Sequence, residues 1–313
     1  MRRSVAAAAL MLLVLGPAGA HASFPGRNGR IAFVRPGLGI YTVKPDGTSR
    51  KPVTPAGAAG GGCDSEPAFA PSGRELAFQT CDLARHATAV GVMGLKGEGR
   101  RIVARDAAPV ASPQTPAFSP GGLRLAFAAG ARDTRLFSVV LDGTRRRGLG
   151  QTGYAPSWSR AGLAYTVPLN RTRWCNSTQL DDVYALDPEL RKRRRLTRNY
   201  GSYSPDWAPD ARHVAYTRDY SVSSSDARRV RGTRDCKVVV RKAQRYGPEI
   251  VVARANGKHG HRLTQLGGSE PAWSPDGTLI AFERSGYIWT MTSDGHHATR
   301  ITKGTEPSWQ PLP

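Results

Sequence analysis

Three glutamates stand directly before prolines that open a recurring motif, and their carboxylates could do electrostatic chemistry together. They are Glu66, Glu270 and Glu306, in a chain of 45 Lys and Arg against 24 Asp and Glu. Crowded carboxylates repel one another unless a cation or a basic side chain lies between them. The sequence therefore predicts a ligand-binding mouth that takes a basic protein or peptide segment, with a metal cation as the alternative occupant. Arginines of the same chain could neutralise the carboxylates instead.

A second candidate site is basic. The region 219–247 surrounds an apolar run, Val238–Val240, with Lys and Arg residues, and Trp174 lies in another long connection, 168–181. Proteins bind acidic glycans or nucleic acids through positively charged side chains and through aromatic side chains that stack on the ligand. A soluble insertion without a ligand is the competing interpretation, because long connections are either functional or disordered. The basic residues are Arg228, Arg229, Arg231, Arg234, Lys237, Arg241, Lys242 and Arg245.

Catalytic motifs with a known mechanism are not found in the sequence. It has no GxSxG nucleophile elbow, no HExxH, no P-loop and no EF-hand loop. We therefore predict no catalytic residues, no cofactor and no metal ligand set. A hydrolase or lyase built from scattered residues at the channel mouth stays as a third alternative, behind binding of a protein or peptide and binding of a cell-envelope polyanion.

A sequence repeat must position these residues. Each copy reads Pro-x-aromatic, a tight turn, an apolar triplet, a second apolar strand, an Asp-Gly turn and Leu-Thr, as the copy from Pro271 to Thr302 shows best. Its turn, Ser274–Gly277, has Pro at the first central position and ends in Gly. Its triplet, Ile280–Phe282, alternates large, Ala, large, so that the large side chains share one sheet face and Ala lets the neighbouring sheet approach.

The spacing of the copies predicts the architecture. The motif opens near 67, 116, 156, 205, 271 and 307, at intervals of 36 to 66 residues. This period fits one four-stranded sheet per repeat. The first copy, from about residue 25, lacks its opening strand, and Pro307–Pro311 supplies that strand. We expect an all-β, six-bladed β-propeller in which the C-terminal strand completes the first blade and removes free sheet edges.

These motifs resemble the TolB-type propeller repeat, with its PxWSPDGxxIAF and IYxxxxDGxxxxLT signatures, over essentially the whole chain after residue 22. Such blades occur in periplasmic Tol-system proteins, in propellers of prolyl-oligopeptidase-like enzymes and in secreted binding proteins. The resemblance implies the fold, and it leaves the ligand open. We expect a non-catalytic, monomeric module that engages a protein or peptide through the loop face around the channel.

The first 22 residues have the pattern of a signal peptide. Arg2 and Arg3 precede the apolar run Val5–Val14, and Ala20–Ala22 forms a small-x-small cleavage site. The run is too short to span a bilayer stably, and no other segment could span. We expect a secreted or periplasmic protein whose single propeller domain covers 23–313.

Four cysteines in an exported chain predict disulfides. The first two strands of the second blade reverse near Ser72, which places Cys63 almost opposite Cys81, within the reach of a disulfide. Cys175 and Cys236 are then left to pair with each other across the two long connections.

Overall fold

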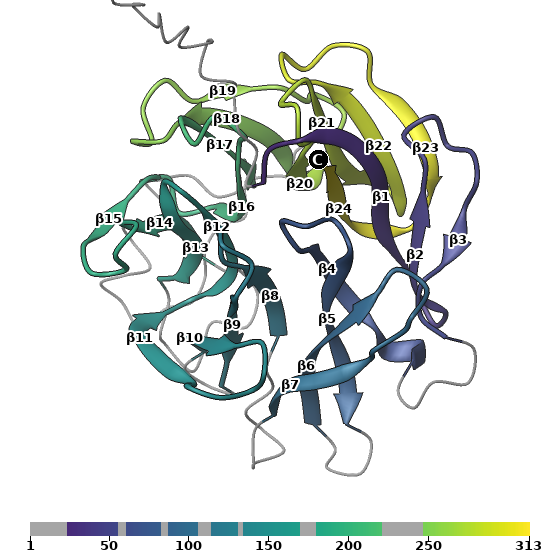
Figure 1. The fold of residues 1–313 in the computed structure, drawn as a ribbon. Coiled ribbons are helices and arrows are strands. Elements are labelled where there is room, and N and C mark those ends of the chain that lie inside the picture. The colour runs from purple at the N-terminus through teal and green to yellow at the C-terminus, as the bar shows by residue number, and fades with distance from the viewer. Residues whose placement is uncertain are drawn as a thin grey trace, which may run out of the picture.

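The strands form a ring of blades. The computed structural model describes residues 24–55, 61–82, 87–105, 114–130, 134–169, 180–220 and 247–313. Within these ranges the strands make six four-stranded antiparallel sheets around a central axis (Figure 1). The helical structure there is a single 3-10 turn, η1 (Gly61–Cys63), and none of it has the length and apolar character needed to cross a membrane. The predicted all-β six-bladed propeller is confirmed.

Blades 2 to 6 run from the hub to the rim in chain order, whereas blade 1 takes its hub strand from the end of the chain. The hub strands, called A, are β4 (Ser65–Phe69), β8 (Gln114–Phe118), β12 (Tyr154–Ser159), β16 (Ser202–Trp207), β20 (Ser269–Trp273) and β24 (Thr305–Leu312). The B strands are β1 (Arg27–Arg35), β5 (Glu75–Asp82), β9 (Arg124–Ala129), β13 (Gly162–Pro168), β17 (His213–Arg218) and β21 (Leu279–Arg284). The C strands are β2 (Gly39–Val43), β6 (Ala87–Gly94), β10 (Arg135–Val140), β14 (Asp181–Leu186), β18 (Glu249–Arg254) and β22 (Tyr287–Thr292). The outer D strands are β3 (Lys51–Pro52), β7 (Arg101–Arg105), β11 (Arg147–Thr152), β15 (Arg193–Arg195), β19 (His261–Arg262) and β23 (Thr299–Lys303).

The two long B to C connections fall where the sequence predicts them, between β13 and β14 and between β17 and β18. Because the strands of a blade alternate in direction, these connections leave the ring on the face of the D to A loops. The predicted signal peptide, Cys175 and Cys236 lie outside the described residues. So do all eight residues of the predicted basic loop, Arg228, Arg229, Arg231, Arg234, Lys237, Arg241, Lys242 and Arg245.

The ring closes through the two ends of the chain. Strand β24 pairs antiparallel with β1, and the register sets Trp309 opposite Ile31 and Ser308 opposite Ala32. Figure 1 shows the yellow C-terminal strand beside the purple N-terminal one. The predicted completion of the first blade by the last strand is therefore confirmed.

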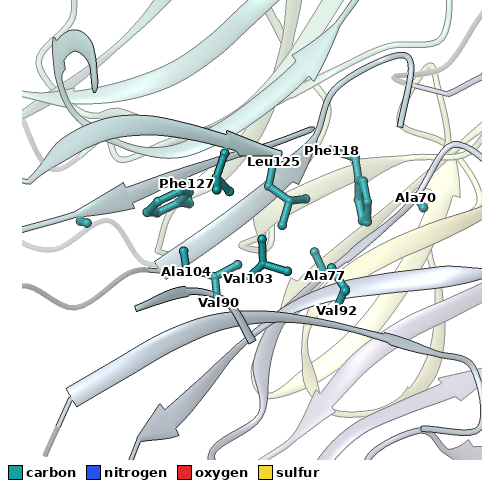
Figure 2. Close-up of a cluster of buried hydrophobic side chains, with 11 residues drawn as sticks. Ala70, Ala77, Val90, Val92, Val103, Ala104, Phe118, Leu125 and Phe127 are labelled. Carbon is teal, nitrogen blue, oxygen red and sulfur yellow. The ribbon is translucent and has the colours of Figure 1, made fainter. Parts of the chain in front are cut away.

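The core consists of six apolar clusters, one at each interface between blades. At every interface the two large residues of one triplet pack on the alanine of the preceding blade's triplet. Figure 2 shows one case, with Leu125 and Phe127 of β9 facing Ala77 and the valines of blade 2. The same rule sets Ile31 and Phe33 of blade 1 against blade 6. The small residue gives the close approach that the sequence pattern predicts.

One disulfide lies in the described residues and matches its prediction. Cys63 bonds to Cys81 with a Cα–Cα distance of 5.7 Å. The register of β4 and β5, with Ser65 opposite Gln79, leads directly to this pair. Closing a loop of 18 residues contributes about 3 kcal/mol in the chain-entropy model. The bond attaches η1 to the C-terminal end of β5.

Candidate functional site

A cavity of about 270 Å³ occupies the hub of the ring. It is enclosed by the six A strands and by Phe24 near the N-terminus. Among the lining residues of this cavity, the charged ones are all acidic: Glu66, Asp206, Glu270 and Glu306. The chain as a whole carries a net charge of +21. The hub therefore favours a positively charged group, whereas the rest of the molecule repels one.

The predicted glutamates reach the cavity through a distortion of the A strands. All six residues that precede the opening prolines have a left-handed backbone, with φ between 46° and 56°. The A to B pairing shifts register at the same point, as it does between Ser65 and Ala68. Proline has no N–H to give to the ladder, so it is tolerated where a β-bulge interrupts the pairing. The six residues are Glu66, Thr115, Ala155, Ser204, Glu270 and Glu306.

The six residues before the prolines lie inside the A strands, not on the loops that lead into them. The reason is that strand pairing begins ahead of the bulge, at Ser65 in β4 and at Ser269 in β20. Their side chains line the wall of the cavity itself.

The three glutamates are neighbours, as predicted. The backbone N–H of Glu66 donates to Oε2 of Glu306 at 2.5 Å. The backbone N–H of Glu270 donates to Oγ1 of Thr217 at 3.0 Å, which ties its bulge to the preceding blade. Among the described residues, no donor contacts the carboxylates of Glu66 and Glu270. These two carboxylates are therefore available to a ligand.

Burial and the repulsion between neighbouring carboxylates raise the pKa values of the three glutamates, which favours their protonated forms. Burial, followed by the charges of Glu306 and Glu270, raises the pKa of Glu66 well above its ordinary value. Burial, Glu306 and Glu283 raise the pKa of Glu270 to about 8. Burial also raises the pKa of Glu306, against the effect of the hydrogen bond from Glu66. A cation brought to this site would reverse these shifts and release protons.

Two acidic residues near the cluster were missed by sequence reasoning. Glu283 of β21 is close enough to Glu306 for the repulsion to raise its pKa, together with burial. The sequence feature that could have identified Glu283 is its position directly after the apolar triplet Ile280–Phe282. Asp206 lines the cavity, but its carboxylate accepts hydrogen bonds from Oγ of Ser157 at 2.9 Å and from the backbone N–H of Trp273 at 2.8 Å. Asp206 therefore joins three blades.

The wall of the cavity also carries large apolar surfaces. Trp273 and Trp309 line it with 8% and 5% of their surface exposed, and Trp158 and Phe24 also contribute. The three tryptophans follow the bulges along the A strands, so they lie nearer to the A to B turns than the glutamates do. The site joins an acidic end to an aromatic one.

The proton-holding cluster predicts a pH dependence of stability. The pKa of Glu270 is about 8 in the folded protein, against about 4.3 for a glutamate in an unfolded chain. The folded state therefore binds more protons between these values, and the free energy of unfolding should fall as pH rises through this range. Replacing Glu270 by Gln should flatten the fall and make the variant more stable than the wild type above pH 8. Thermal unfolding of both proteins across this pH range checks the prediction. If the stabilities of the two proteins changed equally with pH, the raised pKa of Glu270 would be refuted.

Metal binding has little support from the side chains. No group of three or more His, Cys, Asp or Glu residues in the described ranges is arranged to hold a metal ion. A cation between the three glutamates stays an untested prediction.

The fold resembles solved structures, although no protein-family model and no curated protein sequence matches the chain. TolB from Acinetobacter baumannii superimposes with a TM-score of 0.65 at 18% identity, covering 90% of this chain and 67% of that one. A nidogen/laminin complex matches with a TM-score of 0.59 at 12% identity, over 90% and 98% of the two chains. An oligogalacturonate lyase in complex with manganese matches with a TM-score of 0.51 at 12% identity, over 85% and 70%. At these identities the likeness concerns the fold alone.

Proposed function

We propose that this TolB-like six-bladed propeller is a non-catalytic module that binds a basic segment of a protein or peptide in its central cavity. The observation that carries the proposal is the acidic composition of the lining: four Asp and Glu side chains and, among the lining residues, no Lys, Arg or His, in a chain with a net charge of +21.

The size and composition of the cavity define the ligand further. Its volume of about 270 Å³ is slightly below the range for ligand pockets, which is about 300–1,000 Å³. It fits one long side chain or the end of a chain, not a folded domain. A lysine, an arginine or an amino terminus could place its charge among the glutamates while its apolar part packs on Trp273 and Trp309.

The alternatives have less support. A hydrolase or lyase at the same cavity would have to use carboxylates as its general acid and base, because the lining contains no His, Cys or Lys. The polyanion alternative depends on the basic loop of blade 5, which lies outside the described residues. We further propose that the protein is secreted or periplasmic, because its N-terminal sequence has the pattern of a signal peptide. We also propose that it is a monomer.

Affinity capture tests the proposal. The purified propeller and a variant with Gln at Glu66, Glu270 and Glu306 would serve as parallel baits for extracts of the source cells, with mass spectrometry of the bound material. A protein or peptide retained by the wild type and absent from the variant supports the proposal. Capture of an acidic polymer by both baits, weakening steeply between low and physiological salt, would contradict it in favour of the polyanion alternative.

A further inference from the structure

Blade 3 contains two arginines that share one neutral acceptor. Arg124 begins β9 and Arg147 begins β11, while Ser138 lies between them in β10. Nη2 of Arg124 donates to Oγ of Ser138 at 3.0 Å, and Nε of Arg147 donates to the same oxygen at 3.4 Å. A hydroxyl oxygen has two lone pairs, so both are used. Ser138 has no charge, and it leaves the repulsion between the two guanidinium groups uncompensated.

A third arginine adjoins this pair. Nη2 of Arg124 also donates to the backbone carbonyl of Arg145 at 3.3 Å. Burial, followed by the charges of Arg147 and Arg145, lowers the pKa of Arg124. The nearby acid is Asp142, which accepts hydrogen bonds from Thr144 and whose pKa is lowered by these bonds and by Arg145. Asp142 therefore acts on Arg145, whereas the charges that act on Arg124 are those of Arg147 and Arg145. Nε of Arg124 is buried and has no hydrogen-bond partner within the described ranges.

In blade 2, the positions that correspond to Arg124 and Arg147 are occupied by an acidic and a basic residue. The register relates Ala77, Val92 and Arg101 across β5, β6 and β7, as it relates Ala126, Ser138 and Arg147 across β9, β10 and β11. Glu75 therefore corresponds to Arg124. Glu75 and Arg101 form an ion pair at 3.5 Å. Blade 3, like blade 1 with Arg30, has an arginine where blade 2 has the acid of that pair, so Arg124 and Arg147 lack the neighbouring carboxylate that balances Arg101.

The middle arginine of the Arg145–Arg147 run has a different role. The guanidinium carbon of Arg146 lies 4.5 Å from the ring centroid of Phe137, and its Nη1 donates to the backbone carbonyl of Arg105 at 2.9 Å. This side chain packs at the interface with blade 2. Arg147 lies in β11 and Arg145 in the turn before it, and both are close enough to Arg124 for their charges to lower its pKa, after the effect of burial.

We propose that Arg124, Arg145 and Arg147 form a binding site for a phosphate or sulfate group. Guanidinium groups present paired N–H donors that match the oxygens of such an anion. The site lies at the start of a B strand and at a C to D turn, on the face of the ring opposite to the D to A loops. It is therefore separate from the acidic cavity and does not depend on the proposed function.

Titration with inorganic phosphate and with sulfate tests the site, with sodium chloride of equal ionic strength as the reference. Either anion should raise the melting temperature of the full chain by mass action, and chloride should not. Arg147→Gln should weaken binding about tenfold, the loss of one charge-assisted contact. Arg124→Glu would place an acid opposite Arg147, as Glu75 lies opposite Arg101 in blade 2. This variant should therefore abolish binding without lowering the melting temperature in chloride. Arg194→Gln, on the exposed strand β15, removes the same charge elsewhere and should bind as the wild type does.

Two further probes identify the source of the anionic group. Vesicles containing phosphatidic acid present it on a lipid, and a sulfated disaccharide presents it on a glycan. Binding of either by the wild type, lost in Arg124→Glu and kept in Arg194→Gln, supports the site and names its source. If none of the four probes binds the wild type, or if Arg147→Gln and Arg194→Gln bind equally well, the proposal is wrong.

Discussion

Deletion of Pro307–Pro313 is expected to lower the melting temperature sharply and to cause aggregation. The deleted segment is most of β24, which pairs with β1. It contains Trp309, which is 5% exposed and packs against Ile31 and Phe33. Removal of a buried tryptophan side chain alone costs about 3–5 kcal/mol. Domains are typically stable by only about 5–15 kcal/mol, so the loss is a large part of the total.

The deletion also removes links to blade 2. Nε2 of Gln310 donates to the backbone carbonyl of Gly73 at 2.8 Å, and Oγ of Ser308 accepts from the N–H of Phe69 at 3.2 Å. The freed edge of β1 would offer unpaired backbone groups to other chains. Thermal unfolding and light scattering measure both effects, with removal of the exposed Pro313 alone as the control. A truncated protein that melts like the control would show that β24 does not hold the ring closed.

Replacement of Glu66, Glu270 and Glu306 together by Gln is expected to abolish binding of the captured basic segment and to leave the propeller folded. Each charge-assisted contact contributes about 1.5–3 kcal/mol, and about 1.4 kcal/mol changes an affinity tenfold. Loss of two such contacts therefore weakens binding about a hundredfold or more. Gln has the size of a protonated Glu, which is the form that burial favours for Glu66 and Glu270.

A matched control separates the local effect from net charge. Gln at Glu75, Glu98 and Glu189, which lie away from the cavity lining, makes the same three replacements outside the cavity. Equilibrium titration should give this control the affinity of the wild type. Equal weakening of both triple variants would mean that long-range charge, not the cavity, drives binding. Unfolding of the cavity variant by circular dichroism would make the three glutamates structural.

The repeat predicted the fold because its signals are local. The Ser274–Gly277 turn, the alternating triplets and the near-symmetrical placement of Cys63 and Cys81 about a hairpin each depend on residues close in sequence. The closure of the ring was also predictable, since the last copy supplies the strand that the first copy lacks.

The bulges and the contacts between blades were not predictable in the same way. A residue before proline ordinarily avoids the helical region and adopts extended backbone, so nothing local shows that Glu66 adopts a left-handed conformation. Asp206 bonds to Ser157 and Trp273, which are 49 and 67 residues away in the chain. The sharing of Ser138 by two arginines requires the register of three strands. Such features need the three-dimensional arrangement of the blades.

Calorimetry of the captured segment at pH 7, in two buffers that differ in ionisation enthalpy, tests cavity binding most directly. The pKa of Glu270 is about 8 in the protein alone, so much of this carboxyl group is protonated at that pH. A positive charge placed beside it lowers its pKa and drives protons into the buffer. Binding at the carboxylates predicts heats that differ between the buffers for the wild type, together with no measurable binding by the cavity variant. Equal heats in both buffers for the wild type would contradict binding at Glu66, Glu270 and Glu306.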